Sequence, residues 1–400
     1  MTTTTAGVRS TSDLMNLDDE FSEAELDVRA TVREFVDRRI RPNIADWFDR
    51  AVFPVDLVPE MAELGLLGMH LDGYGCAGRS AVEYGLAMQE LEAGDSGIRT
   101  FVSVQGSLAM SAIRRFGSEE QKSAWLPGMA RGEVIGSFGL TEPTAGSDPS
   151  SMVTTARLEA GEWVLNGAKR WIGLASIADL AVIWAKTDDG VRGFIVPTDS
   201  PGFTATAIQP KLSMRASIQC DITLTDVRLP ADAQLPEARG LRAPFSCLNE
   251  ARYGIGWGVI GAARDSYATA LSYSQTRIQF NQPIGAFQLT QQKLVDMAVE
   301  IEKAQLVALR LGRLKDAGRL QPHQISVAKL GNTRAAIAIA REARTILGGN
   351  GISGDYSPLR HAANLESVRT YEGTDEVHTL VLGAHITGFS AFRSTVTEGA

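Results

Sequence analysis

LAVIWAK at residues 180–186 and GFIVP at residues 193–197 flank the turn signal Asp188-Asp189-Gly190, and they decide the fold class of the region around them. Both runs are short and rich in β-branched and aromatic residues, which is typical of strands. Three further runs of this kind, separated by turn signals such as Asn166-Gly167, are VIGSFGL at 134–140, WVLN at 163–166 and CDITLTDVRL at 220–229. The pattern predicts an antiparallel β-domain, a barrel or a sandwich, over residues 134–245 rather than a βαβ array.

A helical region precedes this β-domain. Over residues 18–133, Ser22 and Glu25 form a capping-box signature, and apolar residues then recur at helical spacing until Pro42. We expect a helical domain here, and a disordered tail over residues 1–17 before it.

A second helical region follows, over residues 246–400. We expect one long helix over residues 251–277, a second that ends at Gly318, and a third from Pro322 to the glycines at 348–349. Long apolar helices of this kind usually pack as an antiparallel bundle. The whole chain is therefore predicted to be α+β, with a helical domain, a β-domain and a helical bundle in that order.

The composition is that of a globular protein, with 44% apolar and 22% charged residues over 400 positions. A net charge of −8 without a basic block gives no electrostatic reason to expect a nucleic-acid partner. Cys76, Cys220 and Cys247 lack C-x-x-C spacing, which argues against a disulfide framework or a zinc site. No apolar run reaches the ~18–20 residues that span a bilayer. The first residues lack the apolar stretch of a signal peptide, so we expect a cytoplasmic protein without metal or membrane.

Residues 73–78 match the G-x-G-x-x-G pattern of dinucleotide-binding loops, and Asp95 follows at about the required spacing of 20 residues. That fingerprint also needs a parallel strand before it and another strand after its helix. Helical patterns lie on both sides here, so we interpret the segment as a glycine-rich loop between helices.

Three segments carry residue types suited to a ligand site. FGLTEPTAGSD at 138–148 combines glycines, hydroxyls and loop N–H groups, although an ordinary turn has the same composition. LGGNG at 347–351 is either a helix C-cap or backbone against which a cofactor lies. In TYEGTDE at 370–376, Glu372 is a general base if apolar surroundings raise its pKa, and a solvated helix-start glutamate otherwise.

Together these segments resemble the acyl-CoA dehydrogenase family. FGLTEPTAGSD, the 277–280 stretch with Pro283, LGGNG and YEGT occur in the family's order, and the resemblance covers about residues 20–390. GDSGIRTFVSVQ, CLNEARYGIGWGV and RTYEGTDEVHTLVLGAHITG look most like its glutaryl-CoA dehydrogenase members. The resemblance implies an N-terminal helical domain, a middle β-barrel and a C-terminal four-helix bundle. It also implies FAD, an acyl-CoA substrate, electron-transfer flavoprotein as partner, and a homotetramer built as a dimer of dimers.

Arg99 favours a substrate with a second carboxylate, because a guanidinium is a bidentate, permanently charged clamp for that group. A monocarboxylic substrate would leave it without a partner, and Ser103, one helical turn on, is placed to share the contact. Glu92 lies seven residues before Arg99, so the two can share a helix face; it matches a position linked with the decarboxylating members. The alternatives are a surface arginine and a solvated glutamate. Thr100 stands where these members often have serine.

For such a substrate the resemblance implies that Glu372 removes the α-proton, that the β-hydrogen leaves as hydride to the flavin, and that CO2 loss yields crotonyl-CoA. It implies substrate contacts from Ser147, Asn249, Arg252 and Tyr253. Residues implied around the flavin are Phe138, Leu140, Thr141, Gly146, Ser147, Trp171, Ile172, Gly173, Thr374 and Glu376. Residues implied at the FAD of a neighbouring subunit are Arg277, Phe280, Gln288, Leu347, Gly348 and Gly349.

Gly173 departs from the family's pattern, which usually has threonine or serine after Trp-Ile. A hydroxyl beside flavin N5 is therefore missing, and with it a hydrogen bond worth about 0.5–1.5 kcal/mol. Three reactions stay open: decarboxylation of glutaryl-CoA, dehydrogenation of another short acyl-CoA without CO2 loss, and an oxidase reaction with O2. A flavin-binding protein without dehydrogenation is a fourth alternative, against which Glu372 argues.

Overall fold

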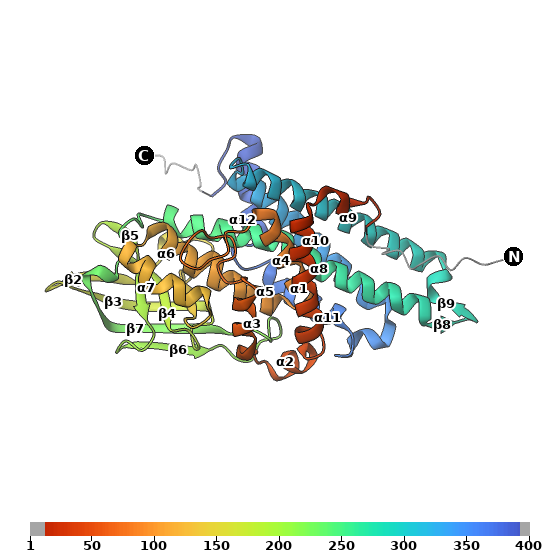
Figure 1. The fold of residues 1–400 in the computed structure, drawn as a ribbon, viewed down its shortest axis with the longest axis horizontal. Coiled ribbons are helices and arrows are strands. Elements are labelled where there is room, and N and C mark those ends of the chain that lie inside the picture. Colours follow the sequence, from red (N-terminus) through yellow and green to blue (C-terminus); the bar gives the residue numbers. More distant parts are fainter. Residues whose placement is uncertain (1–12, 393–400) are drawn as a thin grey trace, which may run out of the picture.

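The computed structural model describes residues 13–392, and the three predicted regions follow one another along the chain (Figure 1). The capping box at Ser22 is confirmed, since its hydroxyl accepts from the amide of Glu25 and its own amide donates to the Glu25 carboxylate. The glycine-rich segment 73–78 is a loop between helices, as interpreted. The elements of the N-terminal region are η1 Leu17–Glu20, α1 Glu23–Phe35, η2 Val36–Ile40, α2 Ile44–Arg50, η3 Val55–Leu57, α3 Val58–Glu63, α4 Ala81–Gly94, α5 Ser96–Val102, η4 Ser103–Met110, α6 Ser111–Phe116 and α7 Glu119–Ala130.

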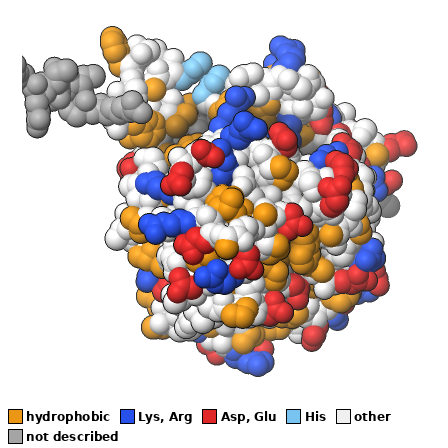
Figure 2. Space-filling view, turned by 90° about the vertical axis from the view of Figure 1, so that its left-hand side faces the viewer, with side chains coloured by type: hydrophobic (Ala, Val, Ile, Leu, Met, Phe, Trp, Pro, Cys, Tyr) orange, Lys and Arg blue, Asp and Glu red, His pale blue; other side chains and the backbone are white. Residues whose placement is uncertain are grey.

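The middle region forms a seven-stranded sheet with the order β1-β4-β2-β3-β7-β6, in which β5 pairs with β4. Most neighbours are antiparallel as predicted, but β1 runs parallel to β4, so the sheet is mixed. On the end of the molecule where the sheet lies, acidic and basic side chains are interspersed (Figure 2). The strands are β1 Gly136–Gly139, β2 Thr155–Glu159, β3 Glu162–Gly173, β4 Leu180–Thr187, β5 Gly190–Pro197, β6 Phe203–Ala207 and β7 Gln219–Pro230, and η5 Pro149–Ser151 and η6 Ala231–Ala233 accompany them.

The C-terminal region is built on three long helices, of which α8 runs from above the sheet to the β8–β9 hairpin at the right of Figure 1. The first of them begins at Arg242, well before the predicted residue 251, so the predicted domain boundary after residue 245 falls inside it. Pro244 lies in the first turn of this helix, where proline is tolerated. The elements are α8 Arg242–Thr276, β8 Ile278–Gln279, β9 Gln282–Pro283, η7 Ile284–Ala286, α9 Gln288–Asp316, α10 Pro322–Ile346, η8 Gly348–Ile352, α11 Ser357–Val368 and α12 Asp375–Thr387. Within residues 13–392, no helix is long and apolar enough to cross a membrane.

Residues 13–17 belong to the fold, so the predicted tail is wrong for these positions. The carboxylate of Asp13 accepts a hydrogen bond from the amide of Leu17 at 2.7 Å, and Leu17 is buried. The amide of Leu14 donates to Glu302 of α9 at 2.8 Å. That partner lies 288 residues away in the sequence, so local composition could not reveal it. The rest of the predicted tail, residues 1–12, lies outside the described residues.

The close approach of α4 and α8 organises the centre of the molecule. Every residue of α4 is buried, and the two helices meet at glycines. A Cβ atom at Gly261 of α8 would lie 1.8 Å from the carbonyl oxygen of Gln89, and one at Gly85 would lie 2.4 Å from the ring of Trp257. The two helices therefore touch through backbone at one point and through the buried Trp257 at another.

We expect Gly261→Ala to lower the free energy of unfolding by about 1–3 kcal/mol or more, because the added methyl group forces the two helices apart. Gly331→Ala in α10 is the matched control, since nothing lies within 4 Å of its added Cβ. This control should be neutral or stabilising by up to about 1 kcal/mol. Denaturant unfolding measures both variants, and equal stabilities would contradict the close crossing.

Candidate active site

Glu372 lies in the short junction between α11 and α12. Its φ of 53° and the φ of 94° at Gly373 place two successive residues in the left-handed region. The hydroxyl of Thr374 then accepts from the amide of Val377 at 3.3 Å and caps α12. A left-handed backbone costs a non-glycine residue about 1–2 kcal/mol, so surrounding contacts must hold Glu372 in this conformation.

The carboxylate of Glu372 points into the protein. Its Oε2 atom is buried and finds no hydrogen-bond partner among residues 13–392. Burial raises the pKa of Glu372 above its usual value, and the charges of Arg99, Arg252 and Lys329 oppose that rise. The environment therefore matches that of a general base rather than that of a solvated glutamate.

Arg252 holds the backbone of this junction. Its Nε donates to the carbonyl oxygen of Glu372 at 2.8 Å, and its Nη1 donates to Oδ1 of Asn249 at 3.2 Å. Both predicted substrate-binding residues thus lie beside Glu372. Tyr253 does not: it is fully buried, and its hydroxyl donates to the carbonyl of Ala81 at 2.6 Å. The structure therefore places Tyr253 in the helix–helix core rather than at a substrate surface.

Glu92 and Arg99 form a buried ion pair. Nε of Arg99 donates to Glu92 at 2.8 Å, and both side chains are 0% exposed. The hydroxyl of Ser96 donates to the other oxygen of Glu92 at 2.8 Å. Gly258 of α8 makes room for the pair, since a Cβ there would lie 2.2 Å from Glu92. The predicted shared face is confirmed, the surface and solvated alternatives are wrong, and Arg99 has a partner within the chain even before any substrate binds.

A second donor of Arg99 reaches the junction that holds Glu372. Its Nη2 donates to the hydroxyl of Tyr371, which also lies 3.4 Å from the hydroxyl of Thr100. Its Nη1 is buried and has no partner within the described part of the chain, and the same holds for the hydroxyl of Ser103. Although burial alone disfavours the cation, Glu92 keeps the pKa of Arg99 above its ordinary value. The guanidinium is thus a permanent charge near Glu372, and its Nη1 has no partner in residues 13–392.

The predicted flavin loop leaves β1 and is anchored by a second buried ion pair. Nζ of Lys169 donates to Glu142 at 2.8 Å and to the carbonyl of Leu140 at 3.1 Å. Glu142 also accepts from two amides beyond the loop, those of residues 153 and 154. Phe138 and Leu140 are buried, whereas the loop residues Gly146 and Ser147 are exposed and Thr141 is partly exposed. The loop is therefore fixed at its base and open at its tip.

Trp171 and Ile172, predicted to lie together near the flavin, point to different sides of β3. Trp171 is 52% exposed with a φ of 62°, whereas Ile172 is buried in the core of the β-domain. Only the indole is therefore free to face a ligand. Gly173 follows, and a Cβ there would lie 3.1 Å from Cγ2 of Val104, so the family's larger residue would press on η4.

A second set of predicted flavin residues lies elsewhere in the chain. Arg277 and Phe280 are on the β8–β9 hairpin, which lies opposite the sheet in Figure 1, and Phe280 is 87% exposed. Gln288 begins α9, Leu347 caps the end of α10, and Gly348 and Gly349 begin η8. The structure does not bring this set to Glu372, which is compatible with the predicted contact to a neighbouring subunit. Thr374 and Glu376 lie in the first turn of α12, next to Glu372, and their contact with the cofactor stays a prediction.

Sequence reasoning missed Tyr371 and Lys329. Tyr371 directly precedes Glu372, and its contact with Arg99 joins residues 272 positions apart in the sequence. Nζ of Lys329 donates to the carbonyl oxygens of Tyr371 and Gly373. A signal for Lys329 exists in the sequence, because it lies on the same helical stripe as apolar Ile325 and Ala336, where a solvated lysine does not belong.

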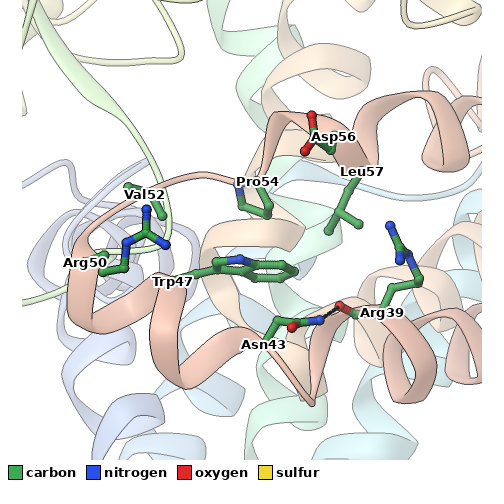
Figure 3. Close-up of a pocket in the computed structure, with 8 residues that line it drawn as sticks. All are labelled: Arg39, Asn43, Trp47, Arg50, Val52, Pro54, Asp56 and Leu57. Carbon is green, nitrogen blue, oxygen red and sulfur yellow. Dashed lines mark hydrogen bonds between the residues drawn. The ribbon is translucent and has the colours of Figure 1, made fainter.

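A surface pocket of about 300 Å³ lies on the N-terminal helical region, around Trp47 (Figure 3). Its lining includes Arg39 and Arg50 but none of the predicted site residues. Arg39 is already paired with Glu60 at 2.7 Å, so we do not take this pocket as the candidate active site. Over the described residues, no group of three or more His, Cys, Asp or Glu side chains is placed to hold a metal ion.

Comparisons with known proteins agree with this arrangement. Family models for the N-terminal, middle and C-terminal domains of acyl-CoA dehydrogenase match residues 22–133, 137–227 and 238–387. The short-chain specific acyl-CoA dehydrogenase of Homo sapiens mitochondria is 36% identical, covering 92% of this chain and 91% of that protein. A solved glutaryl-CoA dehydrogenase from Mycobacterium smegmatis in complex with FADH2 is 58% identical, with a TM-score of 0.95 and coverage of 96% and 99%. Butyryl-CoA dehydrogenase from Megasphaera elsdenii is 30% identical, with a TM-score of 0.88 and coverage of 92% and 98%. The chain belongs to the acyl-CoA dehydrogenase family.

Proposed function

We propose that this protein catalyses the FAD-dependent α,β-dehydrogenation of a short dicarboxylic acyl-CoA, namely the oxidative decarboxylation of glutaryl-CoA to crotonyl-CoA and CO2. The observation that carries the choice of substrate is Nη1 of Arg99, a buried cationic donor without a partner in residues 13–392. Leaving such a donor unsatisfied is costly, and a substrate carboxylate satisfies it. The 58% identity to a glutaryl-CoA dehydrogenase supports the same choice.

The β-domain side of the site suits the flat aromatic ring of a flavin. The half-exposed indole of Trp171 offers an apolar face, with the guanidinium of Arg170 5.3 Å from its ring centre. A Cβ at Gly146 would meet nothing within 4 Å, so the backbone of the anchored loop is open to a ligand. We assign FAD to this surface, where it accepts the hydride that leaves the substrate. Phe138, Leu140, Thr141 and Ser147 of the same loop would hold it.

Glu372 takes the α-proton of the thioester. Its buried carboxylate has no protein partner competing for Oε2, so that atom is available to a substrate C–H. Burial raises the pKa of Glu372 toward the range in which a carboxylate is an effective base near neutral pH. The charges of Arg99, Arg252 and Lys329 favour the ionised form of Glu372, which is the form that accepts the proton.

Arg99 holds the terminal carboxylate of the substrate. Its Nη1 and the hydroxyl of Ser103, four residues on, are both buried without a partner in residues 13–392. Glu92 fixes the Nε side of the Arg99 guanidinium. Because the Glu92 carboxylate compensates part of the charge of Arg99, Arg99 holds the substrate carboxylate less tightly, and this carboxylate can leave as CO2 after dehydrogenation. Protonated Glu372 then returns its proton to the shortened chain, which gives crotonyl-CoA.

Two other reactions have specific support. The 36% identity to a short-chain specific enzyme favours a monocarboxylic acyl-CoA substrate without CO2 loss. Gly173, which has no hydroxyl, favours an oxidase, and hydrogen peroxide formed with O2 as the sole acceptor would identify it. Electron-transfer flavoprotein as acceptor, a homotetramer and a cytoplasmic location complete the proposal.

We expect Glu372→Gln to slow flavin reduction by acyl-CoA about 10²–10⁴-fold, which is the usual contribution of a general base. Stopped-flow absorbance of the flavin under anaerobic conditions measures this rate. Glu366→Gln is the matched control, because this α11 carboxylate is 43% exposed and pairs with Arg341. Reduction of the Glu372→Gln variant at the wild-type rate would rule out Glu372 as the base.

The pH dependence of the same rate follows from the raised pKa of Glu372. The carboxylate must be ionised to accept the proton, so the rate should fall as the pH drops through the raised pKa, above the usual value of 4.5. A rate–pH profile of wild-type flavin reduction checks this. An acid limb at or below the ordinary carboxylate value would contradict the buried environment of the base.

The dicarboxylic substrate is tested by removing both partners of the ion pair, so that no unpaired charge is left buried. In the double variant Glu92→Gln/Arg99→Met, kcat/KM for glutaryl-CoA should fall at least about 30-fold, the loss expected for about 2 kcal/mol of charged hydrogen bonding. The value for butyryl-CoA should fall much less. Equal losses with both substrates would remove the carboxylate clamp from the account.

A further inference from the structure

Three consecutive backbone carbonyls around Glu372 accept hydrogen bonds from two cationic side chains. Nζ of Lys329 donates to the carbonyl oxygen of Tyr371 at 2.8 Å and to that of Gly373 at 2.5 Å. Nε of Arg252 donates to the carbonyl between them, that of Glu372 itself, at 2.8 Å. Lys329 thus holds the carbonyls of the residues before and after Glu372, and Arg252 holds the carbonyl of Glu372 itself.

Lys329 lies on α10 and is 1% exposed. An ammonium group is costly to bury unless hydrogen bonds and opposite charge compensate it. Burial lowers the pKa of Lys329, and the carboxylate of Glu372 opposes this shift. The other ionisable groups that face it from packed elements are Arg252 of α8, Arg99 of α5, Asp375 of α12 and His378 of α12, the last held neutral because burial lowers its pKa to about 3.

We propose that Lys329 is a positioning residue for Glu372: by holding the carbonyls on both sides of the base, it fixes the left-handed turn and so aims the carboxylate toward Arg99 and the substrate. The inference rests on the assignment of Glu372 as the base. Arg252 by itself holds only the central carbonyl, which leaves both flanking peptide planes free to rotate. The two hydrogen bonds of Lys329 remove that freedom and offset the cost of the φ of 53° at Glu372.

Lys329 also acts through its charge. The ammonium favours the ionised form of Glu372, so its removal should raise the pKa of the base further. Positioning and charge have separate signatures. A misplaced base lowers the maximal rate of flavin reduction, whereas a lost cation moves the acid limb of the rate–pH profile to higher pH.

The test is anaerobic flavin reduction in the FAD-loaded variant Lys329→Met, with whichever acyl-CoA reduces the wild-type flavin. We expect the maximal rate to fall about 10²-fold, the loss typical of a displaced catalytic group, with substrate KM little changed and the acid limb shifted upward. Lys303→Met on α9 is the matched control, since this lysine is 64% exposed and pairs with Glu300. It should leave both quantities unchanged.

Lys329→Gln guards against a failure of the methionine variant to fold. The amide keeps hydrogen-bond donors but no charge, so its maximal rate should recover toward the wild-type value while the acid limb stays shifted upward. A crystal structure supplies a readout without turnover: the φ of Glu372 should leave the left-handed region in Lys329→Met, where the flanking carbonyls are released, and stay there in Lys329→Gln, where the amide still donates to them.

Wild-type maximal rate and an unmoved acid limb in Lys329→Met would overturn the inference, as would an unchanged left-handed Glu372 in its crystal structure. A purely structural role would lower the melting temperature and the bound FAD without moving the acid limb. If Glu372→Gln reduces its flavin as fast as the wild type, the base assignment has failed instead, and the crystal structure still decides whether Lys329 holds the junction.

Discussion

The close crossing of α4 and α8 is the constraint on which the site depends. Because Gly261 allows α8 to touch the backbone of α4, the two helices bury Glu92 with Arg99 between them. Gly258, one turn from Gly261, leaves the space that the Glu92 carboxylate occupies. The same helix carries Arg252 to the backbone of Glu372. The same helix crossing thus helps to place both the Glu92–Arg99 pair and the backbone of Glu372.

The charges around the site are unequal. Arg99, Arg252 and Lys329 are the basic groups, while Glu92, Glu372 and Asp375 are the carboxylates that face them; Asp375 is paired with Arg334 and Arg369. Glu92 is committed to Arg99, so the group around Glu372 has an excess of positive charge. Such an excess favours an anionic substrate group and, once the α-proton is removed, the developing negative charge of the thioester. The same positive charges oppose the rise in pKa that burial causes at Glu372.

Local patterns in the sequence predicted the order of the three regions, the capping box at Ser22 and the shared helix face of Glu92 and Arg99. Spacing could not predict that this pair is buried, because the glycines that enclose it lie on a helix that is distant in the sequence. The resemblance assigned Tyr253 to the substrate, and its buried position, with the hydroxyl donating to the Ala81 carbonyl, depends on the packing of α8 against α4.

The junction at Glu372 was also only partly predictable. A glycine at 373 indicates an irregular turn, but the left-handed conformation of Glu372 depends on Lys329 and Arg252, which come from two other helices. The opposite orientations of Trp171 and Ile172 arise at an irregularity of β3, where Trp171 has a φ of 62° and the register with β7 shifts. The family motif alone suggested that both face the cofactor. Long-range packing, rather than local propensity, decided each of these points.

The most direct test of the account is an anaerobic titration of the flavin-loaded protein with glutaryl-CoA labelled at its terminal carboxylate. Flavin absorbance reports dehydrogenation, and trapped label reports decarboxylation. The account predicts that the flavin is bleached and that one labelled CO2 is released for each flavin reduced. Bleaching without labelled CO2, or bleaching by butyryl-CoA but not by glutaryl-CoA, would contradict the role of Arg99 as the clamp for a substrate carboxylate.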